Sequence, residues 1–104
     1  MSTVVVTAVF HPVEGHTAEL IGALRATIPA VHDEQGCRLY AIHDAEDGTI
    51  TMIEKWDSQD DLDAHAGGPA VQALQAAVAG LVAKPATVTT MTPLPVGSAE
   101  KGQL

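Results

Sequence analysis

The sequence predicts one α+β domain with the element order β-α-β-β-α-β and an antiparallel sheet. Runs of β-branched and apolar residues alternate along the chain with segments whose apolar residues recur every three or four positions. An Asp-Gly pair separates the second and third predicted strands, as in a tight hairpin. The first predicted strand is apolar at both alternating positions, so both faces of the sheet should be covered.

The first half of the chain supplies a strand and a long helix. We expect a strand from Thr3 to Phe10, which is rich in valine. A helix should begin near Thr17 and reach about Asp33, because its apolar residues form one stripe. The residues of that stripe are Leu20, Ile21, Leu24, Ile28 and Val31. Pro29 removes one backbone donor late in this helix, so we expect a kink there.

The rest of the chain supplies three strands and a broken helix. The strands are expected at Cys37–His43, Thr49–Trp56 and Ala86–Met91. Ser58 should cap a short helix that ends near His65, before a Gly-Gly-Pro break restarts the helix. The restarted helix should continue to the Lys-Pro pair before the last strand, because one apolar stripe persists that far. The residues of this second stripe are Val71, Leu74, Val78, Leu81 and Val82.

Composition narrows the class of protein. The chain has 104 residues, the size of one domain, and we expect a folded domain over residues 1–95 and a flexible C-terminal tail over 96–104. Five basic residues against thirteen acidic ones give a net charge of -8, which argues against binding nucleic acid or an anionic membrane. The single cysteine, Cys37, excludes an internal disulfide and fits a cytoplasmic location. We predict no secretory signal and no membrane span.

The predicted sheet implies a partner. Two strand-helix-strand units with right-handed crossovers give the ferredoxin-like arrangement, with both helical segments on one face. The other face would then be bare, although the first and third strands carry apolar residues on both sides. An exposed apolar face of this kind marks an interface, and a second copy of the chain is the simplest cover. The alternative is a monomer with a partly exposed sheet.

Few residues suggest chemistry. No pair of the five histidines has metal-ligand spacing, and most of them are expected to be solvated surface residues. The chain has no nucleophile elbow and no Gly-rich phosphate loop, and Cys37 is expected to be a strand residue without a catalytic part. We therefore predict no metal site and no phosphate- or dinucleotide-binding loop.

One constellation remains, formed by Glu54, Trp56, His65 and Tyr40. Glu54 shares a strand face with Trp56, so it should be partly buried and should need a partner. His65 is a candidate partner, because the helix after that strand folds back towards the sheet, and the contact would fix the tautomer of the imidazole. Alternatively, Glu54 bonds to the backbone and His65 merely ends a helix.

These segments resemble the antibiotic biosynthesis monooxygenase family. The resemblance lies in Glu34-Gln35-Gly36-Cys37-Arg38-Leu39-Tyr40, Ile53-Glu54-Lys55-Trp56-Asp57-Ser58 and Leu62-Asp63-Ala64-His65, within a likeness over about residues 3–92. It implies a dimeric α+β barrel with a ligand pocket between sheet and helices, and small oxygenases that need no cofactor. Gln35 replaces the family's usual proline. A haem-degrading branch carries an iron-binding histidine on the second helix, but this chain has no histidine in 66–84.

The resemblance implies oxidation of a small phenol or quinol by dioxygen. His65 would be the base, because the unperturbed pKa of imidazole lies near neutrality, and Glu54 would orient it. Trp56 and Tyr40 would hold the aromatic ring of the substrate. Two alternatives stay open: an isomerase or lyase acting on a small carbonyl compound, and a stress protein that binds a small ligand without turnover.

Overall fold

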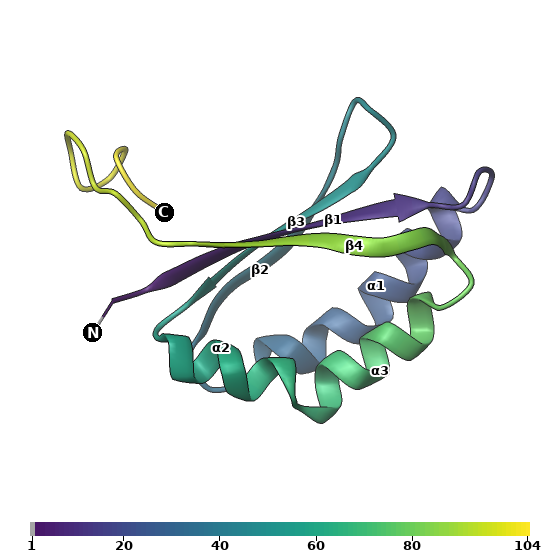
Figure 1. Cartoon of the computed structure of the whole chain (residues 1–104), viewed down its shortest axis with the longest axis horizontal. Helices are drawn as coiled ribbons and strands as arrows, with labels where there is room; N and C mark the ends of the chain where they lie inside the picture. Colours follow the sequence, from purple (N-terminus) through teal and green to yellow (C-terminus); the bar gives the residue numbers. More distant parts are fainter. Residues whose placement is uncertain (1) are drawn as a thin grey trace.

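The computed structural model describes residues 2–104 and places all helices on one face of an antiparallel sheet (Figure 1). Its elements are β1 (Val4–Pro12), α1 (Thr17–His32), β2 (Cys37–Asp44), β3 (Ile50–Trp56), α2 (Gln59–Ala66), α3 (Pro69–Val78) and β4 (Val82–Met91). The strand order is β2-β3-β1-β4, which confirms the ferredoxin-like prediction. Met1, the first residue of the predicted domain, lies outside the described residues.

The core lies between the sheet and the helices. Antiparallel pairing sets Val6 opposite Glu54, Ala8 opposite Met52 and Phe10 opposite Ile50, so alternate residues of β1 and β3 face the helices together. The predicted stripe of α1 supplies the other side of the core through Leu20, Leu24, Ile28 and Val31, all of them buried. Burying one such aliphatic side chain stabilises the fold by about 1.5–3 kcal/mol. Residue alternation in the strands and helical periodicity in α1 thus meet in one core.

The second helical segment ends earlier than predicted. α3 stops at Val78, and Gly80 adopts a φ of 82°, the left-handed region that favours glycine. The backbone N–H of Leu81 donates to the carbonyl of Val78 at 2.9 Å, which closes a turn, and Val82 begins β4. Leu81 and Val82 therefore do not belong to the helical stripe, and the strand starts before Ala86. Pro85 is tolerated inside β4 because β4 is an edge strand.

The opposite face of the sheet carries no helix (Figure 1). Its residues include apolar side chains from all four strands, namely Val5, Val9, Leu39, Ala41, Ile53 and Met91. The segment after β4 rises on this side, where the Nζ of Lys55 donates to the carbonyl of Leu104 at 2.5 Å. Within residues 2–104, none of the helices combines the length and the hydrophobicity that crossing a bilayer requires.

Candidate active site

A cavity of about 630 Å³ opens between the inner face of the sheet and helices α2 and α3. Its wall is mostly apolar, with side chains such as Val6, Phe10 and Leu74. Tyr40, Glu54 and His65 supply its polar groups on the β2–β3 side. A mainly apolar hollow with a few convergent polar groups is the usual form of a small-molecule site.

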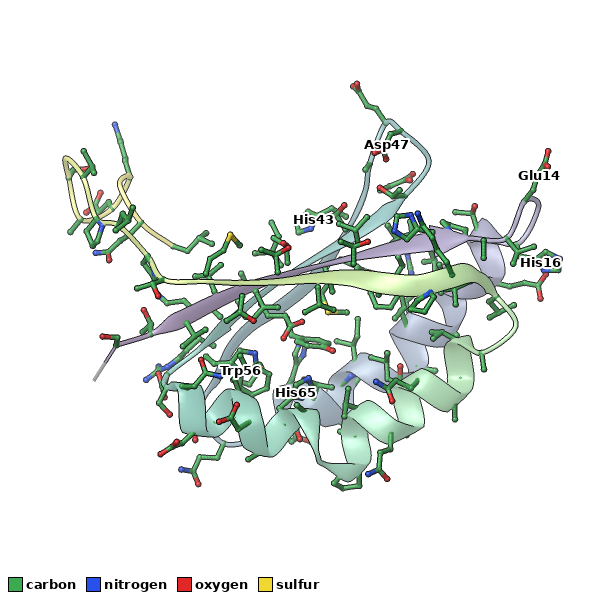
Figure 2. The ribbon with its side chains drawn as sticks, viewed as in Figure 1. Glu14, His16, His43, Asp47, Trp56 and His65 are labelled. Atoms are coloured by element: carbon green, nitrogen blue, oxygen red, sulfur yellow. The ribbon has the colours of Figure 1, made fainter. Side chains whose placement is uncertain are left out.

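The structure brings the four predicted site residues together. Tyr40 on β2 and Glu54 on β3 are direct partners across the sheet, and Trp56 follows on the same face of β3. The ring centroids of Trp56 and His65 are 4.6 Å apart, and those of Tyr40 and His65 are 5.3 Å apart. Figure 2 shows Trp56 and His65 beside each other between the sheet and the helices. Trp56 is fully buried and does not line the cavity, so it lies behind the polar end of the wall.

Helix α2 is positioned by its first residues. The hydroxyl of Ser58 accepts a hydrogen bond from the backbone N–H of Asp61 at 3.1 Å, as a helix cap does. The cap fixes where the helix starts, and His65 then lies in its last turn with 5% of its surface exposed. The predicted role of Ser58 is confirmed, and it sets the place of the imidazole.

Glu54 bonds to Trp56 and not to His65. The indole Nε1 of Trp56 donates to Oε1 of Glu54 at 3.0 Å. Burial raises the pKa of the Glu54 carboxyl, while this hydrogen bond and the nearby His65 act in the opposite direction. The expectation that His65 is the hydrogen-bond partner of Glu54 was wrong, because the neighbouring indole on the same strand face already reaches the carboxylate.

His65 bonds instead to Glu34. The Nδ1 of His65 lies 2.6 Å from Oε1 of Glu34, which follows α1 in the turn that leads to β2. When Nδ1 donates to this carboxylate, the neutral imidazole keeps a free lone pair on Nε2. Within residues 2–104 no hydrogen bond occupies Nε2, and His65 lines the cavity. The pair thus presents a proton acceptor to whatever fills the cavity.

Two glycines let the Glu34 turn approach α2 and α3. Gly36 has a φ of 80°, and a Cβ built on it would overlap the side chain of Asp61. A Cβ on Gly68 would lie 3.3 Å from Oε2 of Glu34 and 3.1 Å from the carbonyl of Ala64. Gly36 therefore requires a residue without a side chain, whereas a side chain at Gly68 would push its neighbours by a few tenths of an ångström.

Sequence reasoning did not identify Glu34 as a site residue. Glu34 and His65 stand 31 positions apart in the chain, and no spacing rule joins a turn residue to a helix residue at that distance. The available signals were the family segment that begins at Glu34 and the glycine two residues later.

Tyr40 completes the polar end of the cavity. Burial raises the pKa of its phenol, and the nearby carboxylates of Glu54 and Glu34 raise it further. The hydroxyl therefore stays protonated near neutral pH and can donate a hydrogen bond to a ligand oxygen.

The remaining histidines do not line this cavity, and three of them bond to the sheet. The contacts are His11 to the Thr87 hydroxyl, His32 to the Tyr40 carbonyl and His43 to the Thr51 carbonyl. His16 lies 2.9 Å from the carboxylate of Glu19 at the start of α1. Among the described residues, no three histidine, cysteine or acidic side chains come together as metal ligands would.

Comparisons with known proteins agree with this fold. The profile described as antibiotic biosynthesis monooxygenase matches residues 3–77. The chain is 34% identical over 99 residues to the Mycobacterium tuberculosis protein named "Putative monooxygenase Rv0793", which covers 94% of this chain and 98% of that protein. The solved structure of Rv0793 matches with a TM-score of 0.83 over 93% of this chain and 100% of the other.

Two further solved structures resemble the chain. SO0527 from Shewanella oneidensis is 30% identical, with a TM-score of 0.78 over 88% of this chain and 90% of that one. A Caulobacter crescentus protein at 22% identity has a TM-score of 0.80 over 89% of this chain and 91% of the other. The second likeness is one of fold alone.

Proposed function

Because the chain belongs to the antibiotic biosynthesis monooxygenase family, we propose that it is a cofactor-independent monooxygenase that oxidises a small phenol or quinol with dioxygen. Family membership supports monooxygenase chemistry in general, and the substrate and the lack of a cofactor are the finer part of the proposal. The observation that carries it is the His65 imidazole, whose Nδ1 is held by Glu34 while its ring lines a mainly apolar cavity.

The chemistry needs a base more than it needs a cofactor. Nε2 of His65 takes the phenolic proton, and the electron-rich phenolate passes one electron to dioxygen. The two radicals join, so that a new C–O bond forms at a ring carbon and gives a hydroperoxide. Loss of the ring hydrogen and cleavage of the O–O bond release water and leave the second oxygen on the ring. A quinol plus dioxygen thus becomes a hydroxyquinone plus water, with all atoms and electrons balanced.

Other residues orient the reactants. The Tyr40 hydroxyl would donate to a substrate oxygen, and the apolar wall would exclude water from the reacting ring. Trp56 supports the site from behind, because its indole holds Glu54 and packs against His65. Glu34, rather than Glu54, would orient the base. Glu54 would meet the substrate beside Tyr40, since both residues line the cavity.

Oxygen consumption with 1,4-dihydroxynaphthalene tests this function. We expect His65→Ala to lower the enzymatic rate above autoxidation by about 100-fold or more, the usual contribution of a general base. His16→Gln is the control, since His16 stands at the start of α1 and does not line the cavity. Full oxygen uptake by His65→Ala would refute the assignment. Turnover of a small carbonyl compound without dioxygen would favour an isomerase or lyase.

We also propose that the chain works as a homodimer through the helix-free face of the sheet. That face carries Val5, Val9, Leu39, Ile53 and Met91, and helices cover only the other side. An apolar sheet face of this kind is uncommon on a monomer. A two-fold axis would bring two identical faces together and shield both.

A further inference from the structure

Acidic side chains line the cavity wall, and His65 is the basic side chain beside them. Glu54 and Asp63 line it, whereas no lysine or arginine of residues 2–104 does. The net charge of -8 adds a negative potential around the opening. A ligand that enters therefore meets carboxylates with no lysine or arginine in the wall to offset their charge.

The two acidic residues lie at different depths in the cavity. Glu54 is 5% exposed and lies at the polar end beside Tyr40. Asp63 lies on the exposed side of α2 where that helix borders the cavity, and its Oδ1 accepts from Nε2 of Gln59 at 2.9 Å. Burial raises the pKa of Glu54, which means that the inner wall disfavours negative charge. A ligand carboxylate would face the same desolvation, with no arginine or lysine to pair with it.

We infer that this cavity accepts uncharged hydroxylated aromatic compounds and rejects those that carry a carboxylate, with Asp63 and Glu54 setting the selectivity. The inference rests on the proposed function, because it narrows the substrate class of the same site. It differs from a size filter, since a carboxylate and a carboxamide have nearly the same shape. The discrimination therefore follows charge and not volume.

Calorimetric titration with a matched pair of probes tests the inference. 1-Hydroxy-2-naphthamide is neutral near pH 7.5, and 1-hydroxy-2-naphthoate carries one negative charge with almost the same outline. We expect the amide to bind at least roughly tenfold more tightly to the unmodified chain. Asp63→Asn should narrow this ratio about threefold and Asp63→Lys about tenfold, because Asp63 is exposed and its field is partly screened.

Asp60→Asn is the matched control. Asp60 lies on the same helix and is exposed, but it does not line the cavity, so its neutralisation should leave the ratio of the two affinities unchanged. Glu54→Gln provides a second variant that keeps an acceptor for the Trp56 indole, and it should also narrow the ratio.

Three results would overturn the inference: equal affinity for both probes, tighter binding of the naphthoate, or no binding of either probe. If Asp63→Lys left the ratio of the two affinities unchanged, Asp63 would have no part in the selectivity. Binding is measured here without oxygen consumption. If the amide binds more tightly but no quinol is oxidised, the result counts against the oxygenase proposal and still supports the charge selectivity.

Discussion

Glu34 is the residue whose removal tests the site most directly. In Glu34→Ala, the Nδ1 of a histidine that is 5% exposed loses its partner at 2.6 Å. A hydrogen bond to a charged group contributes about 1.5–3 kcal/mol. The Glu34 side chain keeps 21% exposure, so water can replace part of the bond, and about 1–2 kcal/mol is the expected loss of unfolding free energy.

This loss should appear in both stability and catalysis. For a domain of this size, 1 kcal/mol corresponds to a shift of roughly 4–8 °C in Tm, so calorimetry at fixed protein concentration should show a fall of about 4–16 °C. The imidazole would also lose its fixed tautomer, and we expect kcat for a quinol to fall about tenfold to 100-fold with a smaller change in KM. Glu34→Gln keeps an acceptor oxygen without the charge, so its Tm and kcat should lie between those of the unmodified chain and those of Glu34→Ala.

Glu14→Ala is the control, because Glu14 is exposed in the turn between β1 and α1, far from His65 (Figure 2). It should change neither Tm nor kcat by a measurable amount. If Glu34→Ala matched this control in both Tm and kcat, the Glu34–His65 hydrogen bond would contribute to neither stability nor catalysis. The argument that Glu34 orients His65 would then fail.

Three further predictions concern other parts of the molecule. Gly68→Ala should lower kcat several-fold at nearly unchanged Tm, because the new Cβ crowds Oε2 of Glu34 while the backbone, at φ -90° and ψ 170°, suits alanine. The comparison variant is Gly22→Ala, because Gly22 has open space around it. That substitution should instead raise the unfolding free energy by about 0.5–1 kcal/mol. Glu54→Gln should be more stable than the unmodified chain near pH 7 and no more stable below about pH 4, as denaturant titrations at several pH values would show. Burial raises the pKa of Glu54 above its ordinary 4.5, so between pH 4.5 and the raised pKa the folded state binds more protons than the unfolded state. The unmodified chain therefore loses stability as the pH rises through that range. A flat difference across pH would contradict this account. Ile53→Glu should convert the proposed dimer to a monomer in sedimentation velocity at micromolar concentration. Ala73→Glu, on the exposed side of α3, is the control and should leave the dimer intact. If the unmodified chain sediments as a monomer, the proposed interface is refuted.

Much of the fold could be predicted because its elements obey local rules. A valine-rich run that is apolar at both alternating positions identified β1, and the stripe from Leu20 to Val31 identified α1. The end of α3 was mispredicted because Leu81 continues the helical spacing, whereas the backbone leaves the helix at Ala79 and turns through the left-handed Gly80. Periodicity records which residues are apolar, and it does not record where the backbone turns.

The site was predictable up to the point where distant segments meet. Tyr40, Glu54 and Trp56 follow from strand pairing and residue alternation, both readable in the sequence. The partner of His65 depends on how closely the Glu34 turn approaches the start of α3, which the packing at Gly68 decides. Tertiary contacts of this kind leave no periodic trace in a single sequence.

Pro85 has a consequence for how the chain can assemble. The proline lies in β4, at one border of the sheet, and it lacks the N–H that an added strand would need as a donor. Addition of a strand along the β4 edge of the sheet is therefore hindered at Pro85. In the homodimer that we propose, contact through the helix-free face would instead bury that face on both molecules, so that assembly would stop at two copies.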